Sequence, residues 1–433
     1  MDAFFPPGPQ KHFVAGNAHQ FTPNPFAFVT ESARTFGELV HFRFGPAHAY
    51  LINHPREAHY VLCEAPERFT DRPNWFKTLN SGMGHDLFTP RETARRHACV
   101  KTAYDPRWLP EYADQIADAA LMLGWSPDDT PYLPTHLKAM TTRMIARLLF
   151  DQASIPTGLS EGIGFTRPFD ERMFHSPLIP TWLPISTRRG RPGALAGLNA
   201  AVSALIAHHQ QEERCGIFAR LLYVAPTVEA AVDEMLTLFY AGSEIVANTL
   251  AWALYLLATN PDQAAELRAE LHTLLAGEPP TSADLPYLSV TETVIRETLR
   301  LYPPVWLIRR QATRETQIGR FYVPSGSTLY VSPYAIHHNP RQFIDPEAFL
   351  PQRFASGYER RINPFSYLPF GAGARASMEE SFVVTLSTLL LAAIAGRWEF
   401  TAARPAPQIE AGLTLKPSSF RLSVATPERV CLA

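Results

Sequence analysis

Residues 370–380 read FGAGARASMEE, and a mostly apolar run, FVVTLSTLLLAAIA, follows from residue 382 to residue 395. Gly371 and Gly373, two residues apart, permit a backbone path with positive φ and a close approach to a flat molecule. Arg375 adds a side chain that is always positively charged. A glycine-rich turn before a helix is often a plain connection, so this stretch indicates a cofactor loop only if other parts of the chain support it.

The composition is that of one large globular protein. The 433 residues contain no Gly/Ser linker, charge block or internal repeat, so we expect a single domain over 1–433. The hydrophobic share of 46% permits a sizeable core. A net charge of −2 and a pI near 6.7 give no electrostatic basis for binding nucleic acid or acidic membranes. We expect neither kind of partner.

The cysteines and the first residues bear on the cellular compartment. The four cysteines are scattered, without the spacing of a zinc site or a disulfide framework. The opening MDAFFPP lacks a basic segment followed by an apolar core of about 7–15 residues. No later stretch reaches about 18 uninterrupted apolar residues. The sequence therefore predicts a cytoplasmic protein, which we expect to be a monomer.

Two parts of the chain are predicted to be rich in β-strand. Strand-like runs on either side of Gly45-Pro46 indicate a β-hairpin within about 38–55, and a second β-rich part is expected at about 306–335. The remaining periodic stretches favour helix. The fold class is therefore mainly α with a smaller β region.

The longest periodic stretch predicts a central helix over about 228–259, ended by Asn260-Pro261. Within it, AGSEI runs from Ala241 to Ile245 and begins with two small residues, Ala241 and Gly242. A charged Glu244 in an apolar stripe is unfavourable unless it has a partner or faces a wet cavity. The simpler alternative is a glutamate that faces solvent.

A second helix, predicted over about 288–302, carries Glu297 and Arg300 on one face, where they can pair with each other and with a third group. Such a pair alone usually means a surface salt bridge. Here LYPPVW follows at 301–306 and PQRF, which includes Arg353, at 351–354, ahead of the loop at 370–380. This order of motifs is highly specific.

Together these motifs resemble the cytochrome P450 family over nearly the whole chain. The resemblance implies the P450 fold, haem b as cofactor, a small apolar substrate and a ferredoxin- or flavodoxin-type redox partner. It implies a buried structural triad of Glu297, Arg300 and Arg353. It also implies a catalytic segment made of Ala241, Gly242, Glu244 and Ile245. The implied cofactor-binding residues are Phe370, Gly371, Gly373, Arg375, Arg310 and His97, with Ser377 as the iron ligand. His97 lies in a basic segment that could equally be a solvated helix face.

Three residues depart from the family pattern. Ser377 stands where the family has a ligand cysteine, Ile245 where it usually has a threonine that helps deliver protons, and Glu379 where it usually has glycine. Thiolate ligation favours O–O cleavage, and a serine oxygen donates less electron density. We therefore expect weakened oxygen activation, with peroxide-dependent or non-oxidative haem chemistry as the retained activities.

Two classes of function stay open at this point. In the first, the protein binds haem through Ser377 and acts as an oxidoreductase of the monooxygenase family. In the second, it is a haem-free relative that serves as a structural or activating partner of another enzyme. The retained glycines and Arg375 favour haem, and Glu379 argues against it. The ligand itself could be Ser377, the Met378 thioether or water, and Ser377 could be natural or engineered; spacing favours Ser377 as the ligand.

Overall fold

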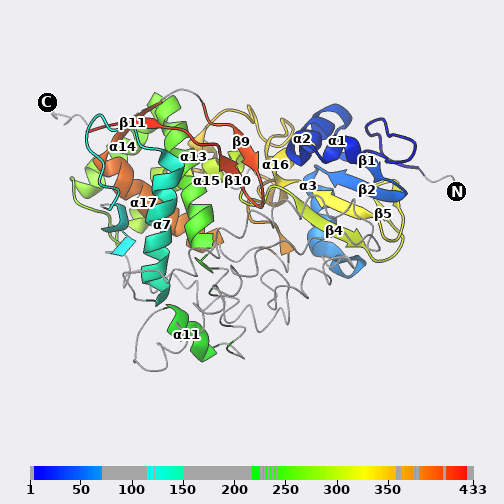
Figure 1. Ribbon diagram of the computed structural model, residues 1–433, viewed down its shortest axis with the longest axis horizontal. Helices are drawn as coiled ribbons and strands as arrows, with labels where there is room; N and C mark the ends of the chain where they lie inside the picture. The colour runs from blue at the N-terminus through cyan, green and yellow to red at the C-terminus, as the bar shows by residue number, and fades with distance from the viewer. Residues whose placement is uncertain are drawn as a thin grey trace.

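The computed structural model separates a helical side from a sheet side (Figure 1). It describes residues 4–70, 115–116, 118–120, 122–150, 217–224, 228, 231, 235, 238–239, 241–356, 362–373, 376, 380–402 and 406–426. Helices dominate the described part and strands form a smaller region, so the predicted fold class is confirmed. The segment around His97 lies outside the described residues.

A five-stranded sheet with the order β1-β2-β7-β4-β3 forms the sheet side. β1 and β2 pair antiparallel on either side of Gly45-Pro46, which confirms the predicted hairpin, and β7 joins β2 in parallel. The sheet therefore brings the two separate β-rich parts of the chain together. Its strands are β1 (Leu39–Phe44), β2 (Ala47–Ile52), β3 (Phe69–Thr70), β4 (Ile308–Ala312) and β7 (Thr328–Val331), with the small hairpin of β5 (Thr316–Ile318) and β6 (Phe321–Val323) beside them.

Short helices surround this sheet. α2 begins after Asn24, whose side chain accepts a hydrogen bond from the backbone N–H of Ala27, and α16 begins after Ser332 in the same way. These caps satisfy backbone groups that a helix start leaves without partners. The short helices are α1 (Ala18–Phe21), α2 (Pro25–Phe36), α3 (Pro55–His59), a π-turn (Tyr60–Glu64) and α16 (Pro333–His337), with 3-10 turns at Pro66–Arg68 and Pro364–Ser366. Two further 3-10 turns, Leu285–Tyr287 and Pro351–Phe354, contact long helices of the helical side instead.

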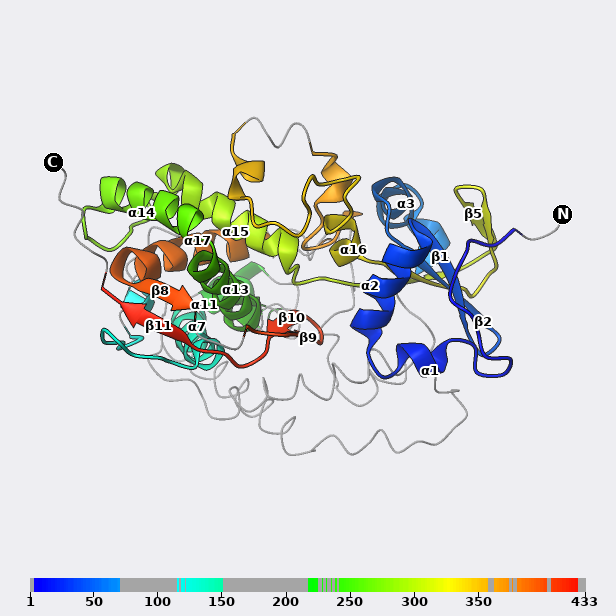
Figure 2. The same cartoon turned by 90° about the horizontal axis from the view of Figure 1, so that it is seen from above.

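The helical side is built around α13 (Val246–Thr259), of whose 14 residues ten are buried. Figure 2 shows α13 between α15 and α17 on one side and α7 on the other. Its neighbours cover most of its surface, so α13 is the central core helix. Around it lie α7 (Leu133–Phe150), α11 (Ile217–Val224), α14 (Pro261–Leu275), α15 (Ser289–Leu301) and α17 (Glu380–Arg397).

A π-turn, Ala241–Ile245, precedes α13, and the described residues between 228 and 239 are helical. The central helix ends at Thr259, as the sequence predicts, and α15 covers Ser289–Leu301 against a predicted 288–302. A π-turn adds one residue to a helical turn and is frequent at functional sites. The motif AGSEI therefore forms a π-turn and not regular α-helix.

α17 is long and apolar enough to cross a membrane by length and composition, but 61% of it is buried inside the protein. It packs against α13, α14 and α15, which is the setting of a core helix. After it, two antiparallel strand pairs close the described chain: β9 (Ile409–Ala411) and β10 (Leu415–Pro417) form a hairpin, and β8 (Glu399–Ala402) pairs with β11 (Leu422–Ala425) from either end of it.

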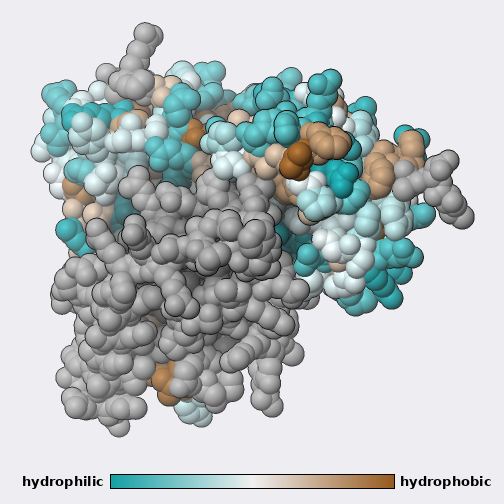
Figure 3. Space-filling model, turned by 45° about the vertical axis from the view of Figure 1, so that its right-hand side comes forward, coloured by the Kyte–Doolittle hydropathy of each residue, from teal (hydrophilic) through white to brown (hydrophobic). Residues whose placement is uncertain are grey.

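The described surface is mostly hydrophilic on the face seen in Figure 3. Large apolar side chains that are exposed, such as Phe13, Tyr223 and Ile344, come from elements far apart in the sequence. Single exposed apolar residues are ordinary in folded proteins and need no functional explanation.

Candidate functional site

Glu244 lies in the π-turn and does not face solvent, since only 6% of it is exposed. Its Oε2 pairs with Lys138 of α7, and its Oε1 lies 2.9 Å from the Nζ of Lys416 in β10. Burial, with a smaller contribution from Lys416, lowers the pKa of Lys138 to about 8. The carboxylate of Glu244 acts in the opposite direction, because an opposite charge favours the ammonium form. The two ion pairs thus leave both oxygens of the buried Glu244 carboxylate paired with lysine side chains.

The same turn has no hydroxyl where the family has its threonine. Ile245 is 7% exposed and offers only hydrocarbon. Ser243 is fully buried, its hydroxyl has no partner in the part of the chain that the structure describes, and its carbonyl accepts a hydrogen bond from Thr141 Oγ1 at 2.8 Å. Residues two apart lie on nearly opposite sides of a helix. Ser243 therefore does not replace a hydroxyl at position 245.

Gly242 has a packing reason for being glycine. A Cβ at this position would lie 2.1 Å from Cδ1 of Ile145 in α7 and 3.4 Å from Cε1 of Phe382 in α17. The central helix thus passes very close to α7 and to the first turn of α17. This contact places the π-turn next to the helix that follows the 370–380 loop. The catalytic role expected for Ala241 and Gly242 stays a prediction.

Three polar side chains of the central helix, spaced four residues apart, fasten the β9–β10 hairpin to it. Residues at this spacing share one helix face. The carboxylate of the first residue pairs with a lysine, the amide of the second donates to a hydroxyl, and the indole of the third donates to a backbone carbonyl. The pairs are Glu244–Lys416 at 2.9 Å, Asn248 Nδ2 to Thr414 Oγ1 at 3.2 Å and Trp252 Nε1 to the carbonyl of Leu415 at 3.1 Å.

Glu297, Arg300 and Arg353 lie together in the core. Arg300 and Glu297 form a two-pronged ion pair at 2.7 and 2.8 Å, and Arg353 Nε lies 3.3 Å from Glu297 Oε1. The side chains of Arg300 and Glu297 are completely buried. Arg300 also donates to three backbone carbonyls, those of His337, Pro346 and Ala348. Every donor of this guanidinium is therefore used, as a buried charge requires.

The described part of the loop has the backbone that its glycines predict, with φ +81° at Gly371 and +79° at Gly373. A Cβ on Gly373 would lie 2.2 Å from the carbonyl oxygen of Leu62, so the loop packs directly on the middle of the π-turn after α3. Phe370 is buried. Arg375 and Ser377 lie outside the described residues, as do Met378 and Glu379.

Arg310 lies on β4, the strand whose Ile308 contacts this loop. Cδ1 of Ile308 would be 3.3 Å from a Cβ added to Gly371, so Ile308 covers the loop. Alternate residues of a strand share a face, and Arg310 is therefore on the same face of the sheet as Ile308. Arg310 Nη1 donates to the carbonyl of Arg309 at 2.9 Å, and this arginine has further contacts. β4 thus places Ile308 against the glycine turn and carries Arg310 on the same face, two residues further along.

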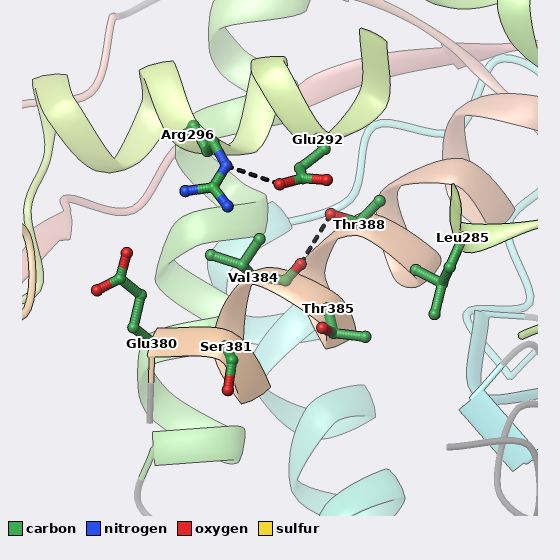
Figure 4. A pocket seen from close by; sticks show the side chains of 8 residues that line it. All are labelled: Leu285, Glu292, Arg296, Glu380, Ser381, Val384, Thr385 and Thr388. Atoms are coloured by element: carbon green, nitrogen blue, oxygen red, sulfur yellow. Dashed lines mark hydrogen bonds and ion pairs between the residues drawn. The ribbon is translucent and has the colours of Figure 1, made fainter. Parts of the chain in front are cut away.

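A pocket of about 460 Å³ opens between α15 and α17, near the start of α17 (Figure 4). Arg296 and Glu292, joined at 2.7 Å, line one side, and Glu380 lines another. Burial raises the pKa of Glu380, and the charge of Arg296 opposes this shift. With three charged side chains in its lining, this pocket does not suit an apolar substrate.

Comparison with known proteins gives the family. The cytochrome P450 family model matches residues 6–155 and 201–424. The chain belongs to the cytochrome P450 family. Cyclooctatin synthase of Streptomyces melanosporofaciens is 32% identical over 422 residues, which cover 92% of this chain and 91% of the relative. Cyclooctat-9-en-7-ol 5-monooxygenase of the same organism is 30% identical, covering 91% and 88%, and pentalenene oxygenase of Streptomyces avermitilis is 28% identical, covering 90% and 89%.

The P450 family implies a haem cofactor, and the described residues fit one. A haem would need a cation for its negative charge, apolar contacts and a close-packed loop, and Arg310, Ile308 and the turn at Gly371 are residues that would supply them. The central helix passes within van der Waals reach of Phe382, just after the loop. The two lysines that pair with Glu244 were not found from the sequence, because nothing in the local sequence around Lys138 or Lys416 marks them as partners of a residue in the central helix.

Proposed function

We propose that this P450 binds haem b with Ser377 as the axial ligand and acts as an oxidoreductase with weakened dioxygen activation. The observation that carries the haem proposal is the contact of Ile308 with the turn at Gly371, together with Arg310 on the same face of β4. A partner protein without a cofactor would have no need for Gly371, Gly373, Arg375 and Arg310 together. Cytoplasmic location, a monomeric state and a small redox partner protein are part of the same proposal.

The side chains at positions 244 and 245 of the central helix are the argument for weakened activation of dioxygen. Haem, when bound, supplies the iron that activates dioxygen or peroxide for oxygen insertion. Proton delivery beside it would fall to residues 244 and 245. Ile245 has no exchangeable proton, and both oxygens of Glu244 are held by lysines. Hydrogen peroxide already carries two electrons and two protons, so converting R–H and H₂O₂ to R–OH and H₂O places less demand on this relay. We therefore propose peroxide-dependent oxidation, with non-oxidative haem chemistry as the remaining option.

The substrate we propose is a carbon-rich alkene or alkenol. The relatives' names include an alkenol, cyclooctat-9-en-7-ol, and an alkene, pentalenene. Such molecules bind through apolar contacts with few polar anchors. The aromatic and proline-rich segment over about 155–195 would contribute to their binding, although it lies outside the described residues.

Absorption spectra test the cofactor and its ligand together. Protein expressed with added haem should show a Soret band, and the ferrous carbonyl complex should lack the red-shifted band of thiolate ligation. Ser377→Cys should create that band, and Ser377→Ala should keep haem bound but alter the ferric spectrum. A ferric spectrum that Ser377→Ala leaves unchanged and Met378→Ala changes would assign the ligand to methionine. Protein without any Soret band or haem mass would instead support the haem-free partner function.

A further inference from the structure

His337, the last residue of α16, is fully buried and uses both of its ring nitrogens. Its Nδ1 lies 2.9 Å from the carbonyl oxygen of Arg300, and its Nε2 accepts the backbone N–H of Leu368 at 2.8 Å. One side chain therefore joins the end of α15, where the buried ion triad lies, to the segment that leads into the 370–380 loop.

The partners of His337 determine its protonation state. An amide N–H points at Nε2, so this nitrogen carries no proton, and a carbonyl faces Nδ1, so the proton is there. Burial lowers the pKa of His337 well below its usual 6.5, and the charge of Arg300 acts in the same direction. In the protonated imidazolium, the Nε2–H would face the backbone N–H of Leu368, and this hydrogen bond would be lost. The neutral Nδ1–H tautomer is thus the form that makes both hydrogen bonds.

Leu368 is where the chain turns toward the glycines. Its carbonyl accepts the backbone N–H of Gly371 at 3.0 Å, and this turn carries the chain to the positive φ of Gly371. Next to it, the backbone N–H of Val305 donates to the carbonyl of Pro369 at 3.1 Å. Tyr367 stacks on the imidazole with ring centroids 5.6 Å apart. The histidine fixes the first residue of the turn, and the neighbouring contacts hold the segment on either side.

We propose that His337 is a positioning residue for the haem loop. Its side chain, in one fixed tautomer, couples the Arg300 end of α15 to the Leu368–Gly371 turn. The proposal rests on the haem function argued above, but the coupling itself is a property of the protein without cofactor. Other single side chains cannot make both bonds: asparagine can reach the Arg300 carbonyl with its amide NH₂, and glutamine can reach the Leu368 N–H with its amide oxygen.

This difference gives the test. His337→Asn keeps the link to α15 and loses the link to the loop, whereas His337→Gln does the reverse. His338→Asn is the matched control, because His338 is its neighbour and has a side chain only 7% exposed. Its Nδ1 lies 2.8 Å from the carbonyl oxygen of Tyr334 and its Nε2 lies 3.8 Å from the exposed Glu347, and neither of these contacts reaches the 366–373 segment. Hydrogen exchange of the peptide over 366–373, in protein with and without haem, and the rate of haem transfer to apomyoglobin are the readouts.

We expect exchange in the 366–373 peptide and haem release to be about tenfold faster in His337→Asn, and close to wild type in His337→Gln and His338→Asn. Equal behaviour of the Asn and Gln variants at position 337 would overturn the proposal, since loss of packing alone would affect both. If wild type takes up no haem, the haem function fails while exchange in the haem-free protein still decides the coupling. Should His337→Asn not fold, ¹⁵N spectra of wild-type histidine decide: a proton on Nε2 of His337 would refute the assignment.

Discussion

Replacing Arg300 by lysine should destabilise the fold strongly although the charge is kept. Arg300 makes five hydrogen bonds, two to Glu297 and three to backbone carbonyls, with no exposed surface. A lysine has three donors on one nitrogen, so at least two of the five bonds are lost. A buried polar group without a partner costs about 1–3 kcal/mol, which gives a loss of about 2–6 kcal/mol.

That loss is a large share of the total stability of about 5–15 kcal/mol expected for a folded protein. Arg296→Lys is the matched control, because Arg296 lies on the same helix and pairs with Glu292 at 2.7 Å, but these side chains are 27% and 41% exposed. A surface pair of this kind contributes about 0–1 kcal/mol. The control should therefore change stability by no more than about 1 kcal/mol.

Urea unfolding, followed by far-UV circular dichroism at one fixed haem occupancy, measures both variants against wild type. Haem occupancy must be equal because a ligand that binds only the folded state adds to its stability. The expected order is wild type, then Arg296→Lys close below it, then Arg300→Lys well below both. Unfolding free energies for Arg300→Lys and Arg296→Lys that agree within about 0.5 kcal/mol would refute the reasoning, because the buried bonds would then contribute nothing beyond a surface pair.

Two further predictions concern the central helix and a buried histidine. Ile245→Thr should raise oxygen-dependent turnover only when combined with Ser377→Cys, because a proton relay is of use only with a stronger electron donor on iron; a large gain from Ile245→Thr alone, measured as product formed per reducing equivalent, would contradict this. Burial lowers the pKa of His338 to about 3, with Arg300 and Arg34 acting in the same direction, so below pH 6.5 the unfolded chain takes up a proton that the folded protein does not. This residue should then lower the free energy of unfolding by about 1.4 kcal/mol for each unit by which the pH falls. Urea titrations between pH 6 and pH 4 should show that the unfolding free energy of His338→Gln depends on pH less steeply than that of wild type, by this amount. Equal slopes would show that His338 is charged in the folded protein.

The local sequence determined those elements that depend on interactions between residues a few positions apart. The hairpin at Gly45-Pro46 and the helix at 289–301 follow from alternation and periodicity, which reflect which side of a strand or helix is buried. The positive φ values of Gly371 and Gly373 follow from the absence of a Cβ. The order of the motifs along the chain was enough to identify the P450 fold, which the family comparison confirms.

The partners of buried charged and polar groups were decided only by tertiary structure. The sequence shows that Glu244 needs a partner, but Lys138 and Lys416 reach it only because α7 and the β9–β10 hairpin both pack against the central helix. Likewise, nothing near His337 predicts its bonds to Arg300 and Leu368. A buried polar group needs hydrogen-bond partners. Which backbone or side-chain groups lie near enough to be those partners depends on how distant segments pack together. No local pattern of residues therefore encodes the identity of the partners.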